Sequence, residues 1–294
     1  MTKAILVDWG TTNCRIWVVL DDGAISTPVL SDRGMSVLTA DQYEEVLIDL
    51  VGDYLGADPV PVVICGMAGA QGGWKEARYQ TVPCAPNDLN EILLVSTQDR
   101  RLKVKILAGV AQNEPADVMR GEETQISGFL ADVPAFDGVI CLPGTHTKWV
   151  HVSAEEIVSF RTFMTGELFS LISKNSVLAG AVENGGWLEE AFLQGVDDAI
   201  SRPELIASRL FALRAEHILQ GSDSTRRRSR LSGLLIGAEI AAAKPYWLGQ
   251  DLVLIGESEL CEVYRTALAS VGQTARAVDA EAATVKGLLR ALCK

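Results

Sequence analysis

The chain has 294 residues, of which 48% are hydrophobic and 22% charged, and its formal net charge is −12. This composition is that of a globular protein with a sizeable core, in one large domain or two, and it excludes a disordered chain. The negative charge disfavours nucleic acid and anionic membranes as partners, because both bind cationic surfaces. No stretch approaches the ~20 apolar residues of a membrane span. One basic run, Arg226–Arg230, precedes an apolar helical pattern and is interpreted as a solvated loop or helix end.

The cysteines and histidines indicate a reducing compartment and argue against a histidine-rich metal centre. The six cysteines form no C-x-x-C pair, and Cys65 and Cys141 lie in apolar runs, where a free thiol acts as a small hydrophobe. The three histidines are too widely separated to form a histidine-rich metal site. Asp8 interrupts the only early apolar run, which argues against a signal peptide, and we expect a cytoplasmic protein.

The first half of the chain predicts strands that end in polar, glycine-bearing turns. Ala4–Val7 and Cys14–Leu20 are apolar runs on either side of a polar turn, which indicates two strands joined by a tight loop. From Tyr43 to Leu55 the apolar residues fall at helical spacing and predict a one-sided helix. Further buried strands are expected at Val60–Cys65 and Val104–Leu107.

The second half repeats this pattern. An apolar strand at Val139–Leu142 reaches another turn of glycine and threonine and returns as a strand at Trp149–Val152, so we expect two similar halves. Strands that alternate with helices indicate an α/β protein. The remaining predicted elements are the helix Pro203–Leu219 with Ser201 available as its cap, the helix Leu231–Ala243, the strand Leu252–Ile255 and a final helix Ala280–Leu292.

The two turns, Asp8–Thr12 and Pro143–Lys148, are candidate phosphate-binding loops. Neither is a Walker A motif, and no G-x-G-x-x-G follows the first strand, so a P-loop and a dinucleotide-binding fold have no support. Tight turns with exposed N–H groups and hydroxyls suit phosphate oxygens, and Asp8 could hold Mg²⁺ directly or through water. Taken alone, the first turn could equally be an ordinary hairpin.

The pairing of these turns resembles the phosphate-1 and phosphate-2 loops of the sugar kinase/heat-shock ATPase/actin superfamily. In that superfamily two ribonuclease H-like domains close on ATP, and one hairpin from each grips its phosphates. The resemblance implies an α/β fold of two such domains with a nucleotide cleft between them. We expect residues 1–135 to carry the phosphate-1 loop and the substrate pocket, and residues 136–294 to carry the phosphate-2 and adenosine loops.

Six motifs make the resemblance more specific. In chain order they are Asp8–Arg15, Gly73–Lys75, Val118–Gln125, Pro143–Trp149, Phe160–Leu168 and Leu231–Glu239. Together they resemble the 2-dehydro-3-deoxygalactonokinase family over essentially the whole chain, although Thr11 and Cys14 depart slightly from its usual residues. That family phosphorylates 2-dehydro-3-deoxy-D-galactonate at its terminal (6-) hydroxyl in galactonate catabolism. The resemblance therefore implies a sugar-acid kinase that uses ATP and Mg²⁺.

The catalytic carboxylates are expected at Glu122, Glu123 and Asp8. Phosphoryl transfer to a hydroxyl needs in-line positioning, charge neutralisation and usually a carboxylate that takes the proton. The place of Glu122 and Glu123, ahead of the second turn, resembles that of the Gly-Asp-Gln motif which supplies the base in glycerol- and xylulose-type kinases. This makes Glu122 the first candidate for the base and Glu123 the second, with Asp8 serving the metal. A helix N-terminus, whose dipole favours acidic residues, is the alternative interpretation.

The ligand contacts are expected from the same motifs. The carboxylate of a sugar acid needs a cation, for which Lys75, Arg120 and Arg161 are candidates; surface salt bridges are the alternative. Met67 and Trp74 could wall the sugar pocket or pack in the core. The adenosine-loop pattern near Gly256 is degenerate. The residues expected around the nucleotide and its phosphates are Gly10, Thr11, Thr12, Arg15, Gly144, Thr145, Thr147, Lys148 and Gly256.

Three other functions stay open from the sequence. A kinase for a related aldonic or 2-keto-3-deoxy acid differs only in which epimeric hydroxyl the pocket accepts. A non-kinase ATPase of the same superfamily usually carries an extra domain, for which 294 residues leave little room. A phosphatase-type hydrolase also opens with Asp-x-Gly-Ser/Thr, but Arg120–Gln125 and Pro143–Trp149 argue against it. The expected partner is a small sugar acid, and a homo-oligomer is left open.

Overall fold

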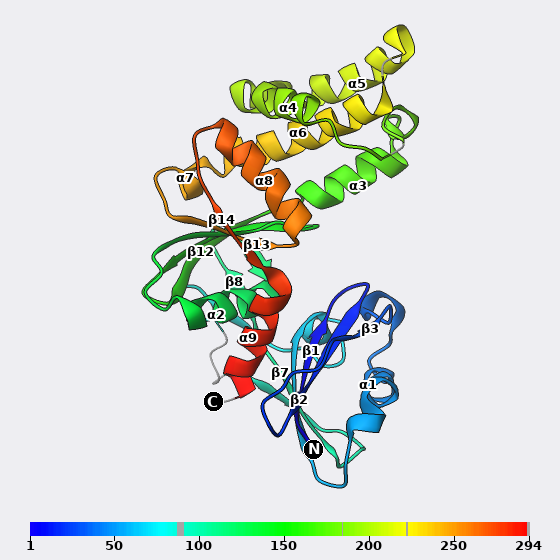
Figure 1. The fold of residues 1–294 in the computed structure, drawn as a ribbon, viewed down its shortest axis with the longest axis vertical. Helices are drawn as coiled ribbons and strands as arrows, with labels where there is room; N and C mark the ends of the chain where they lie inside the picture. The colour runs from blue at the N-terminus through cyan, green and yellow to red at the C-terminus, as the bar shows by residue number, and fades with distance from the viewer. Residues whose placement is uncertain (87–90, 184, 222, 293–294) are drawn as a thin grey trace. The chain divides into compact units, whose positions relative to one another are not determined.

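The computed structural model describes residues 1–86, 91–183, 185–221 and 223–292, and it shows the mixed α/β architecture that the sequence predicts (Figure 1). The chain forms two compact units. Unit 1 contains Met1–Asp137, Val152–Ser159 and the C-terminal segment that begins at Ala280, and unit 2 contains Gly138–His151 and Phe160–Asp279. The last helix therefore groups with the N-terminal part of the chain. The assignment of two ribonuclease H-like domains divided near residue 135 stays a prediction.

Unit 1 is built on a six-stranded sheet with the order β3-β2-β1-β4-β7-β6. β1 pairs antiparallel with β2 and parallel with β4, and in this register Asp8 stands opposite both Arg15 and Cys65. The strands β4 and β7 are also parallel, while β3 and β6 add antiparallel edges. The six strands are β1 (Thr2–Trp9), β2 (Cys14–Leu20), β3 (Val29–Ser31), β4 (Val60–Gly66), β6 (Leu93–Val95) and β7 (Leu102–Ile106).

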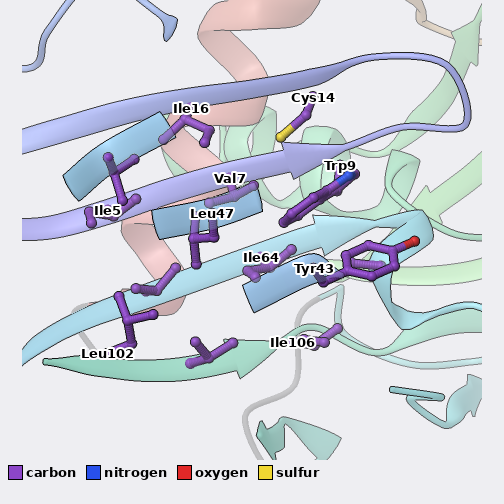
Figure 2. Close-up of a cluster of buried hydrophobic side chains, with 14 of the residues drawn as sticks. Ile5, Val7, Trp9, Cys14, Ile16, Tyr43, Leu47, Ile64, Leu102 and Ile106 are labelled. Atoms are coloured by element: carbon purple, nitrogen blue, oxygen red, sulfur yellow. The ribbon is translucent and has the colours of Figure 1, made fainter. Parts of the chain in front are cut away.

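Both faces of this sheet are buried, and alternate residues of β1 face opposite sides. Ile5, Val7 and Trp9 pack in a core with helix α1 (Tyr43–Val51), which Figure 2 shows in close-up. Ala4 and Leu6 pack instead in the core that contains the last helix of the chain. Because side chains alternate along a strand, Asp8 belongs to this second face, near the C-terminal ends of β1 and β4.

Helices α2 (Glu122–Asp132) and α9 (Ala280–Leu292) pack against each other on that second face. Their backbones approach so closely that a Cβ added at Gly128 or at Gly287 would lie inside 3.0 Å of the other helix's backbone. Only glycine fits at these two positions. The contact fixes α2, and with it the two glutamates of its first turn.

A small sheet leads the chain into α2. Its strands β5 (Tyr79–Thr81), β8 (Gly109–Gln112) and β9 (Asp117–Met119) have the order β5-β8-β9. β9 ends directly before Arg120 and Gly121, and Gly121 has a positive φ of 111°. The short helical turns of unit 1 are η1 (Met35–Val37), η2 (Gly52–Tyr54) and η3 (Met67–Gly69).

Unit 2 combines most of a five-stranded sheet, of the order β12-β11-β10-β13-β14, with a group of helices; the ends of β11 and β12 that meet at Val152–Ser159 group with unit 1. Figure 1 shows α4, α5 and α6 running side by side, and α4 and α6 meet through Gly195, Gly233 and Gly237. The strands are β10 (Gly138–Leu142), β11 (Thr147–Ser153), β12 (Glu156–Phe163), β13 (Leu252–Gly256) and β14 (Arg276–Asp279). The helices are α3 (Thr165–Asn175), α4 (Glu189–Ser201), α5 (Ile206–Gln220), α6 (Ser224–Ala242), α7 (Lys244–Trp247) and α8 (Ser258–Ser270), with the short turns η5 (Ala179–Ala181) and η6 (Pro203–Leu205).

One sequence prediction about these helices is wrong and another holds only in part. Ser201 is the last residue of α4 and does not cap α5, which begins at Ile206 without a side-chain cap. The run Arg226–Arg230 lies at a helix end, because α6 begins at Ser224, but it is not solvated throughout. Arg227 is 3% exposed, and its Nε donates to the carbonyl oxygen of Ala181 at 2.6 Å.

None of the helices in the described ranges combines the length and the apolar character that a membrane span requires.

Candidate functional site

The carboxylate of Asp8 lies at the end of β1 and is held by its neighbours on both sides. Oδ2 accepts hydrogen bonds from Arg15 Nη2 at 2.6 Å and from Arg15 Nε at 3.2 Å. Oδ1 lies 3.7 Å from the Cys65 thiol, and burial raises the pKa of that thiol well above its ordinary value, so the thiol is the donor. Arg15, predicted as a phosphate contact, therefore faces Asp8.

The loop after β1 is a tight turn that presents two hydroxyls to solvent. The N–H of Gly10 donates to Asn13 O at 2.8 Å, and the turn is braced by N–H groups of Met35 and Ser36, which donate to Gly10 O and Thr11 O. Thr11 and Thr12 are exposed. The backbone is thus fixed while the hydroxyls stay accessible, an arrangement that suits a phosphate group.

Glu122 and Glu123 occupy the first turn of α2 and cap the peptide that precedes it. Glu122 Oε2 accepts from Arg120 N at 3.1 Å, and the two oxygens of Glu123 accept from Gly121 N at 2.9 and 2.8 Å. Glu123 is 1% exposed, whereas Glu122 is only partly buried. Burial, and then the charge of Glu122, raise the pKa of Glu123 to about 8. The two carboxyl groups therefore differ in access, and Glu123 keeps its proton at neutral pH.

These groups form one cluster where β1, β4 and α2 meet. A Cβ added at Gly121 would lie 3.5 Å from Gly66 Cα, so the start of α2 is in contact with the end of β4. Thr124 Oγ1 lies 3.4 Å from Glu123 Oε1 and is also within hydrogen-bonding reach of Cys65, and its single hydrogen can serve one of the two. Asp8, Cys65, Thr124 and Glu123 are thus linked in a chain of contacts. We call these four residues, with Glu122 and Arg15, the carboxylate cluster.

The three predicted substrate residues near η3 have different surroundings. Trp74 stacks on Tyr43, with ring centroids 6.0 Å apart, and meets Trp9 edge-on at 6.3 Å, so it packs against the core. Met67 is partly buried in η3, and Lys75 is exposed. Met67 directly follows Gly66, the last residue of β4, and Lys75 stays on the surface.

Arg120 is the one predicted cation of unit 1 that is packed in the protein. Its Nη2 donates to Ala77 O at 2.8 Å, and its guanidinium lies 4.2 Å over the ring of Tyr79. Nε and Nη1 are buried without a hydrogen-bond partner, and the charge of Arg120 acts to lower the pKa of Glu123. Gly69 is packed against Nη1, because a Cβ there would lie 2.9 Å from it.

In unit 2, the loop between β10 and β11 rests on the start of α3. Thr145 and His146 are exposed. Thr145 O accepts from Glu167 N at 3.0 Å, and His146 Nε2 lies 2.5 Å from Glu167 Oε2. A Cβ added at Gly166 would come inside 3.0 Å of Gly144 O. The loop therefore presents Gly144, Thr145 and His146 outward from a rigid base.

Other predicted nucleotide residues of unit 2 lie around this loop. Thr147 and Lys148 begin β11 and are buried, with Thr147 Oγ1 2.9 Å from Tyr264 Oη. Gly256 ends β13, where an added Cβ would lie 3.5 Å from Cδ of Pro143, the first residue of the loop. Arg161, the predicted cation of this unit, is exposed on β12.

Sequence reasoning missed Glu239, a buried carboxyl in the last turn of α6. Oε1 accepts from Trp149 Nε1 at 2.8 Å, and Oε2 accepts from Tyr264 Oη at 2.9 Å and from Thr165 Oγ1. The signal that could have found it is an acidic residue inside the apolar helical pattern Leu231–Ala243, since a buried carboxyl requires polar partners.

Within the described ranges, no three or more histidine, cysteine, aspartate or glutamate side chains are grouped as a metal-binding cluster.

Comparison with known proteins gives one consistent result. A family model described as 2-keto-3-deoxy-galactonokinase matches residues 8–291. A probable 2-dehydro-3-deoxygalactonokinase of Rhizobium meliloti (strain 1021) is 39% identical over 289 residues, which cover 96% of this chain and 94% of that protein. The 2-dehydro-3-deoxygalactonokinase of Escherichia coli (strain K12) is 33% identical over 289 residues, which cover 97% of this chain and 96% of that protein.

Solved structures agree. A crystal structure from Sinorhizobium meliloti, provisionally described as a 2-dehydro-3-deoxygalactonokinase, is 38% identical with a TM-score of 0.91, over 98% of this chain and 97% of that one. Component A of the Acidaminococcus fermentans (R)-2-hydroxyglutaryl-CoA dehydratase, at 12% identity and a TM-score of 0.50 over 98% and 95% of the two chains, shares the fold alone.

Proposed function

This chain belongs to the 2-keto-3-deoxy-galactonokinase family, and on that premise we propose that it transfers the γ-phosphoryl group of ATP to the terminal hydroxyl of 2-dehydro-3-deoxy-D-galactonate. The family resemblance drawn from the six motifs is confirmed. The observation that carries the proposal is that the family match spans both the carboxylate cluster and the loop of Thr145. These two places supply carboxylates and hydroxyls, the groups that phosphoryl transfer to an alcohol requires.

Glu122 is the proposed base that takes the proton of the substrate hydroxyl. It is the more accessible of the two glutamates, and its position is fixed by the hydrogen bond from Arg120 N at 3.1 Å. Glu123 is buried, and the raised pKa of its carboxyl keeps it protonated at neutral pH, so it is a poor proton acceptor. Its bonds to Gly121 N support the start of α2 instead.

Asp8 is the proposed ligand of Mg²⁺, either directly or through water. Mg²⁺ usually keeps several waters and binds one or two carboxylates together with substrate phosphates, so a single carboxylate fits. Arg15 occupies Oδ2, while Oδ1 faces the weak donor of the Cys65 thiol at 3.7 Å. Bound there, the ion would neutralise charge on the phosphates of ATP. Arg15 would orient Asp8 for this task.

The phosphates of ATP are proposed to meet the turn of Gly10, Thr11 and Thr12 and the turn of Gly144 and Thr145. Both turns combine an accessible hydroxyl with a backbone held by hydrogen bonds from neighbouring segments. Fixed N–H and hydroxyl donors stabilise a transferring phosphoryl group without having to reorganise during the reaction. The adenine contacts near Gly256 stay a prediction.

Arg120 is the proposed partner of the substrate carboxylate. Two of its buried nitrogens, Nε and Nη1, lack a hydrogen-bond acceptor. A buried unpartnered donor is unfavourable, and an anion would relieve it. Lys75 and Arg161 are exposed and lack such a signal.

The free, buried thiols of Cys14, Cys65, Cys141 and Cys261 support a reducing compartment, so we place the reaction in the cytoplasm.

A coupled assay of ADP release tests the function. The substrates are 2-dehydro-3-deoxy-D-galactonate, its gluconate epimer, gluconate, galactonate and a neutral deoxy sugar, each measured with and without Mg²⁺. We expect the highest kcat/KM for the first substrate, and none without the metal. Equal or higher kcat/KM for the epimer would reassign the substrate. A rate of ADP release that none of the five compounds increases would refute the assignment as a kinase.

A further inference from the structure

A buried network of hydrogen bonds lies directly behind the loop of Thr145, and its centre is Glu239. This carboxyl is 3% exposed and accepts from Trp149 Nε1 on β11, Tyr264 Oη on α8 and Thr165 Oγ1 at the start of α3. Tyr264 Oη also lies 2.9 Å from Thr147 Oγ1, the hydroxyl where β11 begins. The network therefore joins the strand after the loop to three helices.

The direction of these bonds follows from counting hydrogens. A hydroxyl carries one hydrogen, and that of Tyr264 is donated to Glu239 Oε2. Tyr264 therefore has no hydrogen left for Thr147, and the Thr147 hydrogen points inward, toward Tyr264 Oη and the Glu239 carboxylate, to which Thr147 also bonds. With its only hydrogen directed inward, Thr147 has none to donate to a phosphate, and its side chain is fully buried.

We propose that Glu239 is a positioning residue that directs the Thr147 hydroxyl inward and so anchors the loop, leaving Thr145 as the loop hydroxyl that donates to a phosphate of ATP. This inference deepens the proposed function and rests on it. It revises the sequence-based expectation for Thr147, which becomes a support of the loop instead of a ligand of the nucleotide.

Protonation of Glu239 would reverse the direction of the hydrogen bonds that link it through Tyr264 to Thr147. A neutral carboxyl that donates from Oε2 to Tyr264 frees the Tyr264 hydrogen for Thr147, and Thr147 can then donate outward. Burial raises the pKa of Glu239 to about 7, although its hydrogen bonds act in the opposite direction. The other titratable groups that face it are Tyr264 on α8 and Cys141 on β10, and burial raises the pKa of both well above the ordinary value, so both are neutral.

Glu239→Gln imitates the neutral state with little change of shape. The amide oxygen can still accept from Trp149, while the amide nitrogen donates to Thr165 and Tyr264. The direction of these hydrogen bonds is then reversed at every pH. In NMR spectra of the protein without nucleotide, we expect the Trp149 indole N–H signal to titrate near neutral pH in the wild type and to be independent of pH in Glu239→Gln. Trp149→Phe assigns the signal, and a signal that titrates identically in both proteins overturns the proposal.

A double-mutant cycle tests the anchoring. Calorimetry with an unreactive ATP analogue gives Kd for Thr147→Val, Tyr264→Phe and the double variant. Both changes break the same series of hydrogen bonds, so each should raise Kd roughly three- to tenfold. The Kd of the double variant should exceed that of the more impaired single variant by no more than about twofold. Thr145→Val should weaken binding more than either. Tyr246→Phe, which removes a tyrosine hydroxyl from α7 outside this network, serves as the control and should bind as the wild type does.

Two results of the cycle contradict the anchoring. Losses that multiply in the double variant would mean that Thr147 meets the phosphate independently of Tyr264. Wild-type affinity in Thr147→Val and Tyr264→Phe would mean that the network does not position the loop. A wild type that binds the analogue but phosphorylates no sugar acid contradicts the proposed function alone, because the cycle and the indole signal do not involve the sugar.

Discussion

Arg15 and Asp8 face each other across the β1–β2 pair, with Arg15 Nη2 2.6 Å from Asp8 Oδ2. The side chain of Asp8 is 17% exposed and that of Arg15 is 34% exposed, so the pair is partly shielded from water. A partly buried carboxylate that is fixed by a two-point contact has one defined orientation. The pair therefore belongs to the proposed Mg²⁺ site as one unit.

Substitution of either partner should change the dependence on Mg²⁺. Asp8→Asn keeps the size but removes the charge, and we expect it to abolish metal-dependent turnover. Arg15→Gln removes the group that orients Asp8 and should raise the Mg²⁺ concentration for half-maximal rate about 10- to 100-fold. Arg101→Gln, which breaks a similar contact with Asp99, is the control. A normal Mg²⁺ titration of Asp8→Asn would refute its metal role.

Glu122→Gln and Glu123→Gln should separate the base from its support. Loss of a general base typically costs ~10²–10⁴ in rate, so we expect Glu122→Gln to lose kcat to that extent with little change in KM. Glu123→Gln should retain turnover within about tenfold, because that carboxyl is already neutral near pH 7. Single-turnover phosphorylation measures the chemical step directly. The opposite order of the two losses would move the base to Glu123.

The buried Glu123 should also make stability depend on pH. Its pKa is raised from 4.5 to about 8 in the folded protein. Between these values the folded chain holds a proton that the unfolded chain releases, so the free energy of unfolding falls as pH rises through this window, by up to about 1.4 kcal/mol per pH unit. Urea denaturation at several pH values should show a smaller slope in Glu123→Gln. The exposed Glu204→Gln should keep the wild-type slope, and an unchanged slope in Glu123→Gln would contradict the raised pKa.

Gly69→Ala should disturb Arg120 without removing it. The added Cβ would lie 2.9 Å from Arg120 Nη1 and 2.9 Å from Ile106 Cγ2, so the guanidinium must move. If Arg120 binds the substrate carboxylate, Gly69→Ala and Arg120→Met should both lower kcat/KM for the sugar acid, the latter roughly ten- to a hundredfold, and spare the neutral deoxy sugar. Lys75→Met and Arg161→Met are the matched controls. A selective loss of acid activity in one of these two would identify that residue as the partner instead.

The glycine contact between α2 and α9 should be sensitive to a single methyl group. A Cβ at Gly287 would come inside 3.0 Å of Thr124 O, so Gly287→Ala should destabilise unit 1 by about 1–3 kcal/mol through overpacking. Gly52→Ala, where no atom lies within 4 Å of the added Cβ, is the control. Both are measured by urea denaturation, and equal stability of the two variants would show that the helices can separate without cost.

The local sequence pattern was sufficient to predict the strands that carry the two loops. It was insufficient to predict the buried polar groups that support those loops. Ala4–Val7 and Val139–Leu142 are continuous apolar runs because both faces of each sheet are buried, and both were predicted. Glu239 was not, since its partners Trp149, Thr165 and Tyr264 lie 90, 74 and 25 residues away, and nothing local indicates which hydroxyls will meet it. The arginines of α6 were misjudged for the same reason: the carbonyl that binds Arg227 comes from Ala181.

The contribution of α9 to unit 1 also has a consequence for how the protein is made. Leu288 and Ala291 belong to the core on the second face of the first sheet, together with Ala4 and Leu6. After Met1–Asp137 has been synthesised, all of unit 2 up to Asp279 and then α9 must be translated before this core can close, which takes on the order of 10 s. During that interval the second face of the sheet is uncovered, and the newborn N-terminal part is exposed to chaperones and proteases until its last helix arrives.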